Sequence, residues 1–333
     1  MAHIARAEKP VHKSIVLFRV SDVVNHPLRN YKRYPEVDRI LNVPYGGGVP
    51  ARRKMDLYFS SSARKNGGFP VLFNVHGGGF VAGGKKYRSG IARYFASRGW
   101  FVVNIDYALA PAEVYPAALE DCMLALNEVN ALADKYPLDL TKIVVTGDSA
   151  GGYYAAQLVA AIYDDGLRRS LGLTEYKGAK PRALLTFCAP FEPVKCLSGP
   201  AFGSVATDIA ECLFGKELTP GGRREFEKGK INVTANVNSG WCECFIVEAE
   251  RDGFCGGQLA DMAKALNSAG VPYGYYVASE KRDGHCTHLF PFLAGSGKTL
   301  SAVNAFLDRI AGRDGRKDKT NDTSIGKTDK GGL

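Results

Sequence analysis

Short apolar runs bounded by turn residues alternate with segments of helical periodicity along most of this chain. The apolar runs predict buried strands at 54–59, 71–75, 101–105, 142–145, 183–188, 244–247 and 273–277, with a weaker one at 40–43. Between them, apolar residues three or four positions apart predict helices at 91–98, 117–135, 152–164, 257–269 and 300–310. This alternation is typical of an α/β protein whose mostly parallel sheet is covered by helices on both faces.

Two stretches stand outside the alternation. Residues 1–40 precede the sheet, and residues 191–240 form an insertion rich in glycine, proline and charge. Insertions of that length in a compact domain are usually lids or caps. We therefore expect an N-terminal cap segment (1–40), a core (41–190 and 241–311) and a cap insertion (191–240). Residues 312–333 have almost no apolar side chains, which predicts a disordered tail.

Composition narrows the class of protein. The chain is 45% hydrophobic, enough for a substantial core, and its net charge of +9 comes from scattered basic residues, so we expect no nucleic-acid partner. The eight cysteines form no CxxC pair and no zinc-ligand spacing, so we expect free thiols and neither metal nor cofactor. The chain has no secretory signal and no apolar run long enough to span a bilayer, which predicts a cytoplasmic protein.

The candidate nucleophile is Ser149, at the junction of a predicted strand and a predicted helix. It lies in Gly147-Asp148-Ser149-Ala150-Gly151, a GxSxG pattern. In a strand-to-helix elbow, the small flanking residues let a strained serine project its hydroxyl into a site. The pattern alone is common by chance, and a helix N-cap serine would be the ordinary explanation.

A second glycine motif strengthens that interpretation. His76-Gly77-Gly78-Gly79-Phe80 follows another predicted strand. Glycines let the backbone approach a substrate closely and turn its N–H groups toward a carbonyl oxygen. The N–H groups of these glycines, together with that of Ala150 just after Ser149, can therefore form an oxyanion hole.

The general base and its acid must follow the serine in a chain of this kind, where the order is serine, acid, histidine. Only His285 and His288 come after Ser149, both in the loop beyond the last predicted strand. Asp252 lies just past a buried strand, where its carboxylate can orient a histidine. Asp283 is a weaker alternative because a local loop acid lacks the support of a strand.

Together these motifs resemble the hormone-sensitive-lipase group of α/β-hydrolases, which includes many carboxylesterases, over about residues 54–310. The resemblance rests on 76–80, on Asp106-Tyr107 with Leu109-Ala110-Pro111, on 116–121 and on Gly147-Asp148-Ser149-Ala150-Gly151-Gly152. It implies the α/β-hydrolase fold: an eight-stranded sheet with its second strand antiparallel, and a cap from the N-terminus plus an insertion. It also implies Ser149, Asp252 and a late histidine as a catalytic triad, with Gly77, Gly78 and Ala150 as the oxyanion hole.

The chain departs from the family pattern at three places. Ala108 stands where the family has arginine, Asp252 is followed by Gly253-Phe254 in place of Pro-Leu, and His288-Leu289-Phe290 is most similar to its His-Gly-Phe. That last match favours His288 as the base, whereas the spacing fits His285, after Gly284, slightly better. His288 is our first choice and His285 the alternative.

The expected reaction is hydrolysis of a carboxylic ester through an acyl-enzyme. Apolar cap residues are expected to line a pocket for a small, moderately apolar substrate: Val20, Val23, Val24, Tyr31, Phe191, Phe202, Leu213 and Phe214. The same triad can act on a lactone, an amide or a thioester, or steer a cyclisation, and the scaffold can serve as a binding protein. The sequence leaves those alternatives and a homodimer open.

Overall fold

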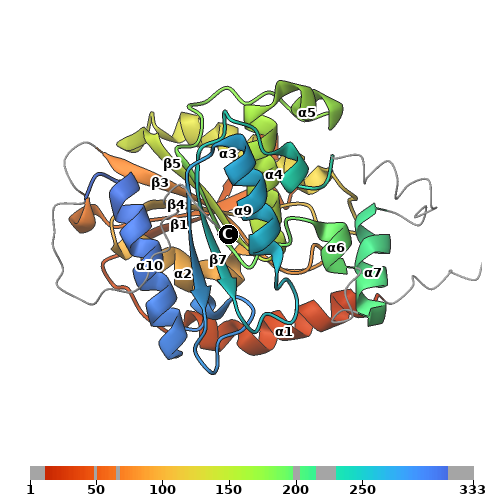
Figure 1. The fold of residues 1–333 in the computed structure, drawn as a ribbon. Helices are drawn as coiled ribbons and strands as arrows, with labels where there is room; N and C mark the ends of the chain where they lie inside the picture. Colours follow the sequence, from red (N-terminus) through yellow and green to blue (C-terminus); the bar gives the residue numbers. More distant parts are fainter. Residues whose placement is uncertain (1–11, 49–50, 65–67, 198–202, 215–229, 314–333) are drawn as a thin grey trace, which may run out of the picture.

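A computed structural model describes residues 12–48, 51–64, 68–197, 203–214 and 230–313 (Figure 1). The strands are β1 (Asp38–Pro44), β2 (Lys54–Phe59), β3 (Phe69–Val75), β4 (Phe101–Ile105), β5 (Leu138–Asp148), β6 (Ala183–Phe187), β7 (Glu243–Ala249) and β8 (Tyr273–Ala278). The α-helices are α1 (Lys13–Asn30), α2 (Ser89–Ser97), α3 (Ala117–Leu132), α4 (Ala150–Tyr163), α5 (Asp165–Ser170), α6 (Pro193–Leu197), α7 (Gly203–Phe214), α9 (Gln258–Ala269) and α10 (Ala294–Ile310). Short 3₁₀ turns are η1 (Gly46–Gly48), η2 (Ser61–Ala63), η3 (Lys85–Arg88), η4 (Thr234–Asn236) and η5 (Thr287–Leu289).

The strands form one sheet in the order β1-β2-β4-β3-β5-β6-β7-β8. β2 pairs antiparallel with β1 and with β4, and every other neighbouring pair is parallel. The fold class, including the antiparallel second strand, is thus confirmed. Parallel strands end at the same edge, so the loops after β5, β6, β7 and β8 gather on one side of the sheet.

Side chains of each central strand alternate between two apolar layers. In β3, Val71, Phe73 and Val75 join the layer that also contains buried residues of α3, α4 and α9. Leu72 points to the opposite layer, with residues of α2 and α10. Figure 1 shows these two groups of helices on opposite faces of the sheet. Burial on both faces explains why the sequence shows continuous apolar runs there.

Most predicted elements are confirmed, with differences at their ends. β5 begins several residues before the predicted 142, because Leu138 and Asp139 pair with Phe69 and Pro70; the extra residues 140–142 of β5 then shift the register. α10 begins at Ala294, earlier than the predicted 300, and its glycines and serine conceal the first turns from a search for apolar spacing. The helices α1, α5, α6 and α7 were not predicted.

The N-terminal helix α1 lies against α7 of the insertion, so the two stretches outside the alternation do meet (Figure 1). Asp208 of α7 accepts hydrogen bonds from the backbone N–H of Ser14 (2.8 Å) and from Nδ1 of His12 (2.8 Å). The domain boundaries themselves stay a prediction. Residues 314–333 of the expected tail lie outside the described residues, as do 198–202, with Phe202, and 215–229.

The prediction that the apolar residues of α1 line a pocket is wrong. Val20, Val23, Val24 and Tyr31 are between 52% and 63% exposed, so they face outward. The inward face of α1 instead carries Ser14 and Asp22, both buried. Phe191 and Leu213 of the insertion are each 1% exposed, so they pack in the apolar core instead of lining an open pocket. In the described residues no helix is long and apolar enough to cross a membrane.

Candidate active site

Ser149 occupies a sharp turn between β5 and α4. Its φ of 52° and ψ of −126° are strained for a residue with a side chain, as expected for a nucleophile elbow. Its backbone N–H donates to the carbonyl of Phe187 at the end of β6 (2.8 Å). Ser149 is only partly buried, although the residues on either side of it are buried.

The glycines around Ser149 are required by close backbone contacts. A Cβ on Gly147 would lie 2.4 Å from the carbonyl oxygen of Gly151. A Cβ on Gly151 would lie 2.1 Å from the carbonyl oxygen of Val75 in β3. Both distances are far inside van der Waals contact, so GxSxG is a packing requirement of this elbow.

Asp252 and His285 form a hydrogen-bonded pair beyond β7 and β8. Nδ1 of His285 lies 2.8 Å from Oδ2 and 3.0 Å from Oδ1 of Asp252. Oδ1 also accepts the backbone N–H groups of Phe254 (2.8 Å) and Cys255 (2.9 Å), which fix the carboxylate. Burial alone would raise the pKa of Asp252, but these hydrogen bonds and His285 hold the pKa below its ordinary value.

The pKa of His285 is raised to about 10. Burial alone would lower it, but the hydrogen bonds to Asp252 and Cys188 outweigh burial. Asp252 is thus placed to hold the imidazole in one orientation and tautomer, which is the role of the acid in a triad.

His288, the first choice for the base, has different surroundings. Its ring stacks on Phe187, with the centroids 3.7 Å apart and the planes 15° apart. Burial is the largest cause that lowers its pKa, to about 3, so the ring is neutral at ordinary pH. The structure therefore pairs Asp252 with the alternative, His285, and gives His288 a packing position.

The other acids near the histidines have partners of their own. Asp283 accepts the backbone N–H of Glu280 (2.9 Å), and Asp261 forms an ion pair with Lys195. Glu248 accepts the backbone N–H of Gln258 (2.9 Å), which fixes the start of α9. These contacts support Asp252 over the alternatives.

The glycine loop after β3 differs from the prediction at its first residue. The N–H of Gly77 donates to Oδ1 of Asp148 (3.2 Å), so it is directed away from a substrate. Among hydrogen bonds of the described residues, the N–H groups of Gly78, Gly79 and Ala150 have no acceptor. Gly78 (φ 145°) and Gly79 (φ 61°) adopt the positive φ that only glycine takes easily. The geometry therefore supports Gly78 and Ala150 but not Gly77.

A buried ion pair beneath the elbow was missed by the sequence analysis. Arg88 of η3 binds Asp148 through Nε (2.8 Å to Oδ1) and Nη2 (2.6 Å to Oδ2), and both side chains are buried. Nη1 of Arg88 lies 3.5 Å from Asp22 of α1, which also pairs with Arg29 (3.0 Å). This network connects the cap helix to the residue before the nucleophile. Nothing in the spacing of residues 22, 29, 88 and 148 indicated it.

We expect Arg88→Met to destabilise the fold by about 3–5 kcal/mol, because it leaves the Asp148 carboxylate buried without a counterion. Urea unfolding at neutral pH measures this. Burial alone would raise the pKa of Asp148, but Arg88 holds it well below its ordinary value, so the pair contributes stability above about pH 4. The deficit of the variant should shrink only as the pH falls below about 4, where the carboxylate of the unfolded chain takes up a proton.

The matched control is Arg98→Met, which breaks a pair with Asp308 (3.1 Å) whose side chains are 38% and 31% exposed. Surface pairs of this kind contribute about 1 kcal/mol or less. Equal destabilisation by the two variants would show that the buried pair has no special role.

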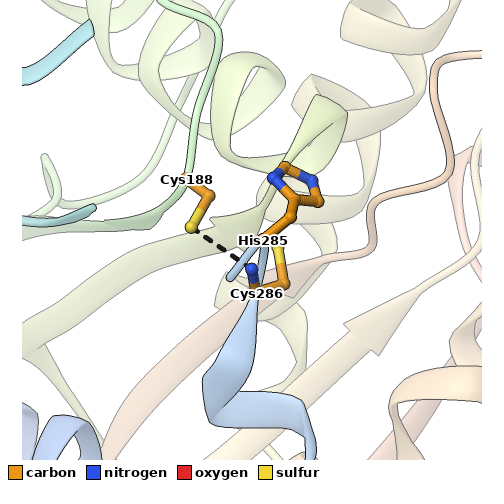
Figure 2. A group of neighbouring side chains, drawn as sticks. All are labelled: Cys188, His285 and Cys286. Carbon is orange, nitrogen blue, oxygen red and sulfur yellow. Dashed lines mark hydrogen bonds between the residues drawn. The ribbon is translucent and has the colours of Figure 1, made fainter. Parts of the chain in front are cut away.

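Two thiols lie beside His285 (Figure 2). Cys188 follows β6, and its Sγ accepts the backbone N–H of Cys286 (3.3 Å). Both cysteines have positive φ, 50° and 57°, which is rare for residues with a side chain. A hydrogen bond with the Cys286 side chain lowers the pKa of Cys188 to about 7, against burial, which would raise it. Residues 188 and 285–286 are far apart in the chain, so no sequence motif indicated this group.

The fold and the motifs agree with comparisons to known proteins. A family model for the alpha/beta hydrolase fold matches residues 72–289. The esterase LipI of Mycobacterium tuberculosis is 34% identical over 178 residues, which cover 48% of this chain and 54% of LipI. The carboxylesterase NlhH of the same species is 34% identical over 153 residues, covering 44% of this chain and 46% of NlhH. The chain thus matches about half the length of these relatives.

Solved structures are similar over nearly the whole chain. Esterase B from Lactobacillus rhamnosis has a TM-score of 0.78 at 18% identity, covering 90% of this chain and 94% of its own. The hyperthermophilic esterase from Pyrobaculum calidifontis has a TM-score of 0.69 at 22% identity, covering 89% and 92%. At these identities the structures show the fold alone. From the family match and the motifs at 76–80 and 147–151, this chain belongs to the α/β-hydrolase family, in its hormone-sensitive-lipase-like group.

Proposed function

We propose that the protein is a carboxylesterase-type serine hydrolase with Ser149 as nucleophile, His285 as general base and Asp252 as the acid. The observation that carries the proposal is the hydrogen bond of His285 to Asp252, on the sheet edge where Ser149 forms a strained elbow. The three residues of the proposed triad thus follow three different strands: Ser149 comes after β5, Asp252 after β7 and His285 after β8. The names of the relatives, esterase and carboxylesterase, support the same activity.

The reaction follows from these positions. Ser149 Oγ attacks the carbonyl carbon of the ester while His285 takes the proton of the serine hydroxyl. The carbonyl oxygen becomes an oxyanion. His285 then gives the proton to the departing alcohol, which leaves an acyl group on Ser149. Water then attacks the acyl carbon while His285 takes its proton, and His285 returns that proton to Ser149 Oγ as the acid is released. Asp252 stays ionised and stabilises the imidazolium at each step.

The oxyanion would be held by the N–H groups of Gly78, Gly79 and Ala150. Ala150 is the first residue of α4, so the positive end of a helix also points at the developing charge. Gly79 takes the place of Gly77, because the N–H of Gly77 is bound to Asp148. Phe18 of α1 covers Gly79, since a Cβ there would lie 2.2 Å from its ring.

The substrate we infer is a small, uncharged and moderately apolar ester. The relatives named acetyl esterase, from Salmonella strains, are consistent with a short acyl group. We also infer a reducing compartment such as the cytoplasm, because all eight cysteines are unpaired.

Two measurements on purified protein test the proposal together. A fluorophosphonate probe should label one serine, identified as Ser149 by peptide mass spectrometry. A panel of p-nitrophenyl esters of increasing acyl length should be hydrolysed, fastest for short chains. Tight binding of a small molecule by protein that shows neither labelling nor hydrolysis would identify a binding protein and reject the esterase.

The pH dependence should reflect the raised pKa of His285. A general base must be neutral, so the pKa of about 10 predicts that kcat/KM rises with pH well above the ordinary histidine value of about 6.5. The measurement is kcat/KM for a p-nitrophenyl ester across that range, corrected for spontaneous hydrolysis. Because Cys188 also raises this pKa, Cys188→Ala should shift the rise to lower pH. A rise centred at or below about 6.5 in the wild type would contradict the assignment.

A further inference from the structure

The group of Cys188, His285 and Cys286 offers three ligand atoms in one place. Their two Sγ atoms and a ring nitrogen of His285 all lie within 4.8 Å of one another. In tetrahedral zinc sites, Zn–S bonds of about 2.3 Å separate two sulfur ligands by about 3.8 Å, so small side-chain movements would complete such a set. Figure 2 shows Cys188 and Cys286 reaching the same region from different segments, beside the histidine ring.

We propose that this group is a binding site for one thiophilic divalent cation, such as Zn²⁺ or Cd²⁺, and that its occupation switches the hydrolase off. Two thiolates and an imidazole are the ligands that such ions prefer over harder oxygen donors. Binding forms two metal–sulfur bonds and one metal–nitrogen bond, and the two thiol protons pass to solvent. No oxidant or reductant is involved. The inhibitory part of the proposal rests on the proposed role of His285.

Inhibition follows whichever ring nitrogen binds the ion. If Nε2 binds it, the lone pair that would take the serine proton is occupied. If Nδ1 binds it, Asp252 loses the hydrogen bond that orients the ring. When Nε2 binds the ion, Nδ1 can keep its hydrogen bond to Asp252, and a carboxylate behind a ligating histidine is common around zinc.

The backbone favours a preformed site. Cys188 is fixed by its N–H, which donates to the carbonyl of Val247 (2.7 Å), and by the N–H of Cys286 on its sulfur. Cys286 and Cys188 are both buried and both held at positive φ. A second group of potential ligands, His12, Asp208 and Cys212, contains a single thiol and has its histidine and carboxylate already paired. The pair at Cys188 and Cys286 is therefore the better soft-metal site.

The test is a Cd²⁺ titration of the whole protein, with a phosphine reductant present so that disulfides do not form. Cd²⁺ bound to thiolates gives an ultraviolet charge-transfer absorption, which reports binding independently of activity. We expect one equivalent of Cd²⁺ to produce this absorption and to abolish p-nitrophenyl ester hydrolysis with the same midpoint. A chelator should reverse both.

Variants identify the site. Cys188→Ser with Cys286→Ser should shift both midpoints by more than the ~100-fold that loss of an outer partner of a metal ligand typically costs. Each single variant is made as well, and each is compared with its own metal-free rate. The matched control is Cys196→Ser with Cys255→Ser, which removes another buried pair of thiols, with Sγ atoms 3.7 Å apart, and should change neither midpoint.

The outcomes separate this proposal from the proposed function. An absorption that is missing in the wild type, persists in the Cys188/Cys286 variant or disappears in the control variant overturns the metal site. Metal binding at the predicted residues without loss of hydrolysis overturns the inhibitory role. Protein that binds Cd²⁺ as expected but never hydrolyses an ester rejects the esterase and leaves the metal site standing.

Discussion

Replacing Ser149 with alanine is expected to lower kcat for ester hydrolysis by about 10⁶-fold, because no other group in the elbow can form the acyl-enzyme. Steady-state assays with a p-nitrophenyl ester measure the loss. Fluorophosphonate labelling should disappear as well. Alanine keeps a small side chain at the strained φ of 52°, so the fold should persist.

The control for this variant is Ser170→Ala, at an exposed position at the end of α5. It should keep both the rate and the labelling. Circular dichroism and urea unfolding should give the same result for the two variants and the wild type. Residual labelling of Ser149→Ala at the wild-type level would move the nucleophile to another residue.

Replacing His285 with alanine should cost about 10⁴- to 10⁶-fold in kcat, since it removes the base and leaves the serine hydroxyl protonated. Asp252 keeps its two backbone N–H donors from Phe254 and Cys255, so the variant should remain folded. His288→Ala should act on stability instead. It removes a buried ring stacked on Phe187, a change comparable to a buried aromatic truncation of about 3–5 kcal/mol.

Replacing each histidine with phenylalanine distinguishes a role in catalysis from a role in packing. Because His288→Ala could unfold the protein, His288→Phe keeps a ring against Phe187 and should retain activity within about 10-fold, whereas His285→Phe should not. Kinetics and urea unfolding are measured for all four proteins. Loss of activity in His288→Phe with full activity in His285→Phe would restore the first choice from the sequence.

The strands and the nucleophile could be predicted because each depends on local sequence. Buried parallel strands require unbroken apolar runs, and the elbow requires small residues at 147 and 151, where a Cβ would strike backbone atoms. The resemblance to a family added the antiparallel β2, which no run of residues specifies.

The choice between the two histidines could not be made from the sequence. The motif around His288 matched the family pattern better, but motif similarity does not report which ring reaches Asp252. That depends on the path of the loop after β8, in which η5 turns His288 back onto Phe187. Likewise, the sequence could not indicate that the N–H of Gly77 donates to Asp148, because that carboxylate lies 71 residues further along the chain.

The orientation of the cap helix α1 could not be predicted from the sequence either. Val20, Val23 and Val24 have the spacing of an amphipathic helix, and an apolar face normally turns inward. In α1 the inward face carries Asp22 instead, which joins the network of Arg29, Arg88 and Asp148. These ion pairs join residues far apart in the chain, and the periodicity of α1 carries no information about them.

The place of β8 in the sheet has a consequence for inactivation by heat or denaturant. β8 is an edge strand with one neighbour, and most of its residues are only partly buried, whereas β5 lies inside the sheet. Edge elements open at a lower free energy than the rest of a domain. His285 follows β8 and Ser149 follows β5, so fraying of this edge separates base from nucleophile while the core stays folded. The working lifetime of the enzyme would then be set by local opening of one strand.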